Sequence, residues 1–121
     1  MRSLLFGFVL VVCAAPVIAQ DDFSSEEQLE RRLRACLVSG SAGAPRDSLV
    51  SAVVAVRSLC YTQINRLRDF RLREIDGSFG LSRARLSAIR QDELDRARDV
   101  ETRRLNDEIA RAISNFTGLT E

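Results

Sequence analysis

Apolar residues recur between positions 49 and 67 at the spacing of one face of an α-helix. The steps between them are four, three, four, four and three residues, which places the side chains on a single stripe. Cys60 lies within this stripe, so a bond made by its sulfur would tie another segment to the same face. We therefore expect the rest of the chain to pack on the stripe, whose members are Leu49, Val53, Val56, Cys60, Ile64 and Leu67.

A shorter amphipathic segment precedes the stripe and is expected to form the first helix, from about Ser24 to Ser39. Ser24 is its predicted N-cap because Glu27 lies three residues later, as in a capping box. A loop over residues 40–46, rich in Gly and Ala, follows this helix. The apolar face of the first helix carries Leu29, Leu33, Cys36 and Leu37.

The second predicted helix carries the stripe and extends beyond it. Asp47 or Ser48 is expected to cap its N-terminus, because both side chains accept hydrogen bonds from a first helical turn. The helix should continue to about Asp76, with Gly77 as the residue that ends it.

The third predicted helix is the longest. Ser82 is its expected N-cap, no Pro or Gly interrupts it, and Gly118 ends it just after Phe116. Roughly 34 helical residues would span about 50 Å. Acidic residues precede arginines by four positions on its surface, as is typical of a solvated helix. These predicted pairs are Asp92–Arg96, Asp99–Arg103 and Asp107–Arg111.

The N-terminal 19 residues have the pattern of a secretory signal peptide. Arg2 supplies the positive charge, residues 4–12 form an apolar run, and Ala19 ends a small-residue cleavage site. An uncleaved membrane anchor is the alternative, but the apolar stretch is shorter than the roughly 20 residues of a spanning helix. A lipid anchor on Cys13 is a further alternative. We predict a periplasmic or secreted mature chain that begins at Gln20.

Two cysteines remain after cleavage, and an oxidising compartment favours a disulfide between Cys36 and Cys60. Cys60 would lie about 18 Å into its helix, whereas bridged Cα atoms are within about 7 Å. The 40–46 loop must therefore run back along the second helix. The first helix would then bring its acidic N-terminus beside the arginines at positions 66–73.

These elements define the predicted fold. No segment alternates in the manner of a strand, so the fold class is all-α. Three helices are expected in one domain over residues 20–121, arranged on a long antiparallel helical hairpin of the second and third helices. One intrachain disulfide ties the first helix to the second.

Composition excludes several kinds of function. The chain has 18 basic residues, all of them Arg, 17 acidic residues and no His. Without Arg2, basic and acidic residues are equal in number, so the net charge does not favour binding to nucleic acid. Without imidazole or a suitable cysteine cluster, we expect no metal site, no cofactor and no enzymatic activity. The expected function is that of an interaction protein.

Unequal helix lengths predict where a partner would bind. The first helix is too short to cover the whole hairpin, so the C-terminal half of the third helix should keep an uncovered apolar patch. The expected occupant is another envelope or secreted protein, or a second copy of this chain. The predicted partner-binding residues are Val100, Leu105, Ile109, Ile113 and Phe116.

An arginine-rich segment at the tip of the hairpin offers an alternative function. It could bind an anionic membrane surface or other envelope anions, although a solvated tip neutralised by the acidic N-terminus accounts for the same residues. The candidate anion-binding residues are Arg66, Arg68, Arg71, Arg73, Arg83 and Arg85.

Overall fold

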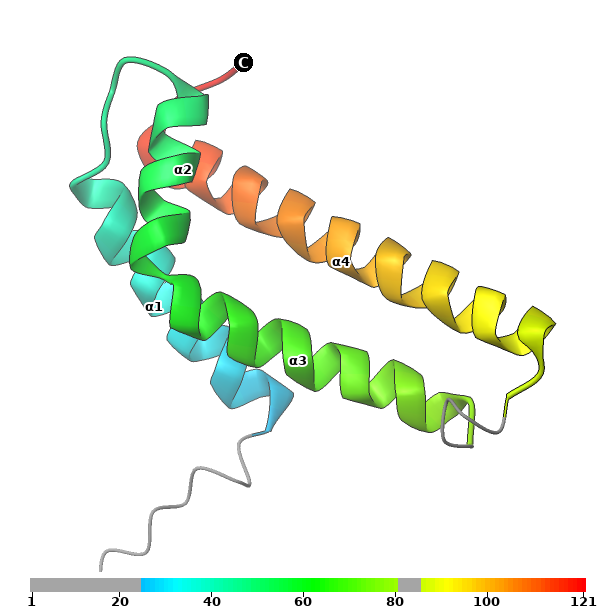
Figure 1. Ribbon diagram of the computed structural model, residues 1–121. Helices are drawn as coiled ribbons and strands as arrows, with labels where there is room; N and C mark the ends of the chain where they lie inside the picture. The colour runs from blue at the N-terminus through cyan, green and yellow to red at the C-terminus, as the bar shows by residue number, and fades with distance from the viewer. Residues whose placement is uncertain (1–24, 81–85) are drawn as a thin grey trace, which may run out of the picture.

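The computed structural model describes residues 25–80 and 86–121, and within these ranges every regular element is an α-helix (Figure 1). The signal peptide predicted over residues 1–19 lies outside the described residues. The all-α prediction is confirmed, and so is the disulfide between Cys36 and Cys60, whose Cα atoms are 5.8 Å apart. The helices are α1 (Glu26–Ala42), α2 (Leu49–Leu59), α3 (Tyr61–Ser78) and α4 (Ala88–Thr117).

The predicted second helix is wrong in one respect, because it is divided at Cys60 into α2 and α3. The Cys60 N–H donates to the Val56 carbonyl at 2.9 Å, and the Cys60 carbonyl accepts from the Ile64 N–H at 3.0 Å. Hydrogen bonds on the core side therefore continue across the break. Helices commonly bend in this sense, convex toward solvent and wrapped around the core. The kink lets α2 and α3 both pack against α1 and α4 (Figure 1).

Serine side chains cap three of the helices. Ser25 accepts a hydrogen bond from the Gln28 N–H, one residue later in the chain than the predicted cap. Ser48 caps α2, as one of the two predicted candidates. Ser87 caps α4, whereas the predicted cap Ser82 lies outside the described residues. Gly118 ends α4 in the left-handed conformation, at φ 71°, as glycine after a helix commonly does.

Gly40 lies inside α1, although the first helix was predicted to end just before this residue. A Cβ atom at this position would be 3.2 Å from Val56 Cγ1, closer than ordinary van der Waals contact. The glycine therefore allows α1 and α2 to approach each other closely. Because α1 continues to Ala42, it is longer at its C-terminus than the predicted first helix.

Gly77 lies in the last turn of α3 and does not end the helix as predicted, because the C-cap is Phe79. A Cβ atom there would meet nothing within 4 Å. Gly77→Ala should therefore stabilise the protein by about 0.5 kcal/mol through helix propensity and reduced freedom of the unfolded chain. Gly40→Ala should lack this gain, because its methyl group meets Val56. Denaturant unfolding of both variants checks the contrast, and equal effects would contradict it.

The core lies where α1, the α2–α3 pair and α4 meet. The predicted stripe is confirmed at its centre, since Val56, Cys60, Ile64 and Leu67 are all buried. Two of the predicted surface pairs of α4 also form, Asp92–Arg96 and Asp99–Arg103. Among the described residues, no helix is long and apolar enough to cross a membrane. The remaining large core residues are Leu29, Leu33, Leu37, Leu105, Ile109 and Ile113.

Candidate functional site

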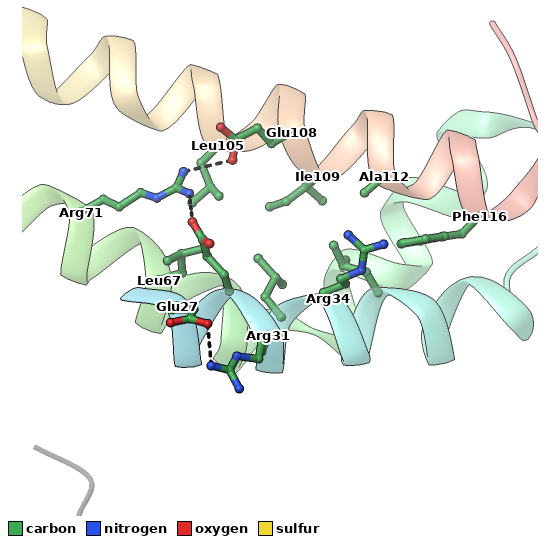
Figure 2. A pocket seen from close by; sticks show the side chains of 13 residues that line it. Glu27, Arg31, Arg34, Leu67, Arg71, Leu105, Glu108, Ile109, Ala112 and Phe116 are labelled. Carbon is green, nitrogen blue, oxygen red and sulfur yellow. Dashed lines mark hydrogen bonds and ion pairs between the residues drawn. The ribbon is translucent and has the colours of Figure 1, made fainter. Parts of the chain in front are cut away.

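A groove of about 300 Å³ lies between α1 and α4, with α3 at one end (Figure 2). Side chains from all three helices line it, so it depends on the packing that the disulfide helps to hold. We call it the α1–α4 groove. Its lining residues are Glu27, Glu30, Arg31, Leu33, Arg34 and Leu37 of α1, Leu67 and Arg71 of α3, and Leu105, Glu108, Ile109, Ala112 and Phe116 of α4.

The floor of the α1–α4 groove is apolar because two helices turn their core faces towards each other. Leu33 and Leu37 are one turn apart on α1, and Leu105 and Ile109 are one turn apart on α4. All four side chains are buried. Charged side chains of α1 and α4 form the rim above this floor. The groove is thus an apolar slot with a polar border, the usual composition of a binding pocket.

Phe116 closes one end of the α1–α4 groove. Its ring is only partly buried, and the Arg34 guanidinium lies 5.9 Å from the ring centroid. Figure 2 shows the Arg34 side chain between the two helices, directed towards Phe116. A cation–π contact at such an exposed position is worth only about 0.5–1 kcal/mol. A ligand could therefore displace Arg34 at little cost.

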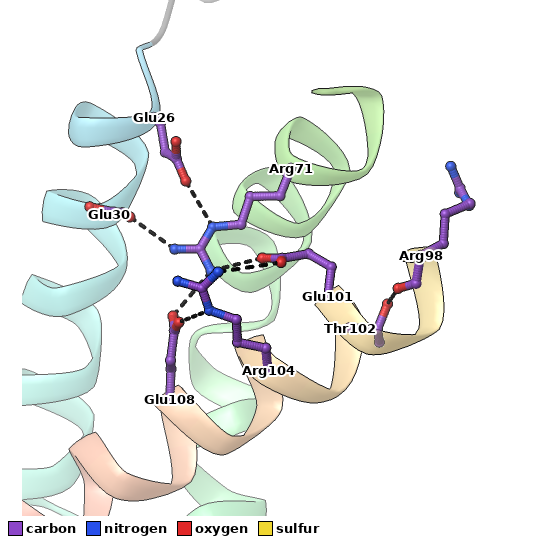
Figure 3. A network of polar contacts seen from close by, with 8 residues as sticks. All are labelled: Glu26, Glu30, Arg71, Arg98, Glu101, Thr102, Arg104 and Glu108. Carbon is purple, nitrogen blue, oxygen red and sulfur yellow. Dashed lines mark hydrogen bonds and ion pairs between the residues drawn. The ribbon is translucent and has the colours of Figure 1, made fainter. Parts of the chain in front are cut away.

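Arg71 occupies the opposite end and is surrounded by carboxylates (Figure 3). Its Nε donates to Glu26 at 2.9 Å and its Nη2 donates to Glu30 at 2.9 Å. Its Nη1 donates to Glu108 at 3.1 Å and to Glu101 at 3.3 Å. One guanidinium on α3 thereby links α1 to α4.

Arg104 joins the same group of charges from the outer side of α4. It contacts Glu108 at 3.1 Å and Glu101 at 3.8 Å, so both carboxylates are shared between two arginines. Two guanidinium groups therefore face four carboxylates, and this end of the groove carries an excess of negative charge. We call these six residues the Arg71 cluster: Glu26, Glu30, Arg71, Glu101, Arg104 and Glu108.

The electrostatics of the Arg71 cluster favour the charged guanidinium. Burial by itself would lower the pKa of Arg71, but hydrogen bonds to Glu108, Glu30 and Glu26 and the charge of Glu108 raise that pKa well above its ordinary range. The raised pKa means that the Arg71 guanidinium itself is charged at acidic, neutral and mildly alkaline pH, and that its own titration would cost stability only at strongly alkaline pH. Arg71 therefore acts as a permanent cation within the fold.

The structure corrects the predicted apolar patch on the third helix. Leu105, Ile109 and Ile113 are 3%, 1% and 0% exposed, so the expectation that they lie uncovered is wrong. They belong to one buried cluster with leucines of α1 and with apolar residues of α2 and α3, so these helices cover this side of α4. Val100 is 61% exposed but does not line the α1–α4 groove. Of the predicted set, Phe116 alone lines the groove with an appreciably exposed side chain.

The structure places the arginines of the predicted hairpin tip in different surroundings. Arg71 is sequestered in its cluster, as expected from the acidic N-terminus, whereas Arg68 contacts its neighbour Asp69. Arg66 and Arg73 are exposed. The described arginines therefore do not form one continuous anion site, and the other two, Arg83 and Arg85, lie outside the described residues.

A second apolar surface follows the outer side of α2 into α3. Val50, Val54 and Tyr61 are 72%, 62% and 67% exposed. Their spacing of four and seven residues places them on one side of the two helices. We call this surface the α2 strip. It was not singled out from the sequence, because these residues lie beside the stripe and read as part of the same apolar segment.

The described residues contain no group of three or more His, Cys, Asp or Glu side chains arranged to hold a metal ion. The Arg71 cluster is thus held together by guanidinium groups. No family model, curated protein or solved structure matches the chain.

Proposed function

We propose that this chain is an exported α-helical interaction protein that binds a partner protein in the α1–α4 groove. The observation that carries the proposal is the groove itself, an apolar slot of about 300 Å³ with a charged rim at the junction of three helices. A slot of this size accommodates one or two side chains rather than a whole helix. The partner would therefore insert an aliphatic or aromatic anchor, as is common at binding hot spots.

Charge complementarity indicates what lies beside that anchor. The Arg71 cluster has two guanidinium groups against four carboxylates, and Glu26, Glu30 and Glu108 each keep 40–49% of the side chain exposed. A basic residue of the partner would find an acceptor there without displacing Arg71. The expected partner segment is an amphipathic helix with an apolar anchor and, about one turn away, an Arg or Lys.

Export is part of the proposal and has its own support. The disulfide joins Cys36 and Cys60 in the core, and such bonds persist in oxidising compartments. The signal-like pattern of the first 19 residues agrees with this. Binding to an anionic membrane surface through Arg66 and Arg73 is a weaker alternative, because Arg71 between them is already occupied by carboxylates.

Filling the groove should abolish partner binding. Ala112 is a partly buried residue of the groove wall on α4, and Ala112→Leu should occupy the space of the anchor. Leu and Ala have similar helix propensities, so the helix should remain intact. Ala35→Leu makes the same change on the exposed face of α1 and is the matched control. In a pull-down, the oxidised, mature wild-type protein should capture a partner. The Ala35→Leu variant should capture the same partner, and the Ala112→Leu variant should not.

Defined peptides provide a second measurement. Short helical peptides with two Leu residues one turn apart and a following Arg should bind more tightly than the same peptides with Glu. Fluorescence anisotropy should show a loss of about tenfold or more for Ala112→Leu, the effect expected when an anchor pocket is blocked. If Ala112→Leu and Ala35→Leu retain the same partners and peptides, the groove is not the binding site.

Light scattering on the mature protein tests self-association. If the partner is a second copy, Ala112→Leu should convert a dimer to a monomer and Val54→Glu on the α2 strip should not. The reverse result would place the self-association surface on the α2 strip and contradict a role for the groove.

A further inference from the structure

A second depression, of about 320 Å³, lies between α4 and the kink that joins α2 to α3. It is separate from the α1–α4 groove, from which it differs in composition, and Leu105 is the one residue that lines both. We call it the kink pocket. Its lining residues are Arg57, Ser58, Tyr61, Ile64, Asn65 and Arg68 of α2 and α3, with Thr102, Leu105 and Asn106 of α4.

Hydrogen-bond donors dominate the polar part of the kink pocket. Arg57 donates from Nη1 to Asn106 Oδ1 at 3.0 Å, which fixes the guanidinium and leaves its other N–H groups available. Because the Asn106 oxygen accepts this bond, its amide N–H groups remain as donors. Arg68 and the Tyr61 hydroxyl are further donors among the lining residues.

The acceptors of the kink pocket are weak by comparison. None of its nine lining residues is Asp or Glu. The partner of Arg57 is a neutral amide, whereas Arg71 on the next helix is enclosed by four carboxylates. Arg68 does contact Asp69 at 3.2 Å, but both side chains are substantially exposed, and such pairs contribute little. The pocket therefore has an uncompensated positive charge beside neutral donors.

We propose that the kink pocket binds a phosphate monoester, with Arg57 and Arg68 on the phosphate oxygens. Arginine pairs with phosphate through two parallel hydrogen bonds, and Arg57 lines the pocket with its guanidinium anchored to Asn106. The floor of the pocket is formed by Ile64 and Leu105, which are buried and apolar. This floor suits the carbon skeleton of an organic phosphate better than a free inorganic ion.

Tyr61 provides an internal probe for this site. The chain contains one Tyr and no Trp, so its intrinsic fluorescence reports on a single residue that lines the kink pocket. Titration with glycerol phosphate, at constant ionic strength set by chloride, should give a saturable change in fluorescence. Inorganic phosphate should bind more weakly, because it does not reach the apolar floor.

Three variants separate a built site from general surface charge. Arg57→Gln removes the fixed guanidinium and should weaken binding by about tenfold or more, as for other charge-assisted hydrogen bonds. Arg66→Gln removes the same charge from an exposed position of α3 outside the pocket and should change affinity less than about twofold. Asn106→Asp keeps an oxygen acceptor for Arg57, so the fold should be retained, but it adds a carboxylate and should abolish phosphate binding.

The source of the phosphate is distinguished by a separate arm with vesicles. Vesicles that contain phosphatidic acid, whose phosphate is a monoester, should co-sediment with the protein if the ligand is a lipid headgroup, and glycerol phosphate should then compete. Binding of the soluble ester without co-sedimentation would identify a soluble ligand. If neither binds, if Asn106→Asp binds glycerol phosphate as tightly as the wild type, or if Arg66→Gln weakens binding as much as Arg57→Gln does, the proposed site is excluded.

Discussion

Loss of the disulfide should lower the free energy of unfolding by about 3–4 kcal/mol, the value that the chain-entropy model gives for cysteines 24 residues apart. Such a loss is a large part of the roughly 5–15 kcal/mol by which domains are stable. For a domain of about this size it corresponds to a decrease in Tm of about 15–25 °C. Cys60→Ser and Cys36→Ser should both show this decrease.

Comparison of the two serine variants separates the effect of losing the disulfide from the effect of changing the core packing. Cys60 is fully buried in the core, whereas Cys36 is only half-buried. A serine hydroxyl at position 60 must be desolvated without an assured partner, so Cys60→Ser should be the less stable variant. Cys36→Ser reports mainly on the crosslink, although it leaves Cys60 as a buried thiol.

Thermal melts of both variants should be recorded beside the oxidised and the fully reduced wild type. Reduced wild-type protein should resemble Cys36→Ser, because each lacks the bond and keeps the packing of Cys60. A melt of Cys36→Ser within a few degrees of the oxidised protein would show that the bond contributes little. Free thiols in the native oxidised protein would also contradict the assignment.

The features that depend on local periodicity were predictable from the sequence. The stripe through Val56, Cys60 and Ile64 identified the core face, and the count of cysteines identified the bridge. The kink at Cys60 was not predictable, because the apolar steps of four residues continue across it without a break. A bend that keeps its core-side hydrogen bonds leaves the hydrophobic pattern unchanged, so only tertiary packing decides where it lies.

The uncovered patch was predicted wrongly for a related reason. Glycine after an apolar segment usually marks a helix end, and Gly40 was interpreted in that way. Gly40 instead allows α2 to pack close to α1, and the sequence of α1 alone does not show this. With α1 and α2 packed closely, Ile109 and Ile113 lie in one buried cluster with leucines of α1 and with Val56 of α2.

The candidate sites were predictable only in part. The predicted disulfide placed the acidic N-terminus of the first helix beside the arginines of α3. The structure confirms this for Glu26 and Glu30, which both contact Arg71. The contacts of Glu101 and Glu108 with Arg71 could not be predicted from the sequence. Whether these two side chains face α3 depends on how α4 is rotated about its axis. One signal for the kink pocket was available in the sequence: Arg57 is the one charged residue within α2.

Arg71→Met should lower the free energy of unfolding at neutral pH by about 2–3 kcal/mol, below the usual 3–5 kcal/mol for breaking a buried ion pair. The Arg71 side chain is 10% exposed, but three of its four carboxylate partners are 40–49% exposed and would be solvated in the variant. Met retains the aliphatic stem, so the loss reports on charge. Arg73→Met, at an exposed position of the same helix, should change stability by less than about 0.5 kcal/mol.

The salt dependence gives this prediction its sharpest test. In Arg71→Met, four carboxylates remain close together with Arg104 as their remaining neighbour in the cluster. Sodium chloride at about 1 M shortens the screening length to about 3 Å and should reduce this repulsion, so the deficit relative to wild type should shrink.

Urea unfolding of wild type, Arg71→Met and Arg73→Met at low and at high salt measures that difference. A deficit of equal size at both salt concentrations would mean that Arg71 stabilises the fold through the packing of its stem. A deficit that grows with salt would contradict the expected sign. The result also bears on the α1–α4 groove, because a variant that folds without the Arg71 guanidinium would leave the acidic end open to the basic residue of a partner. Such a variant should then bind arginine-containing peptides more tightly than the wild type, an increase that anisotropy can measure directly.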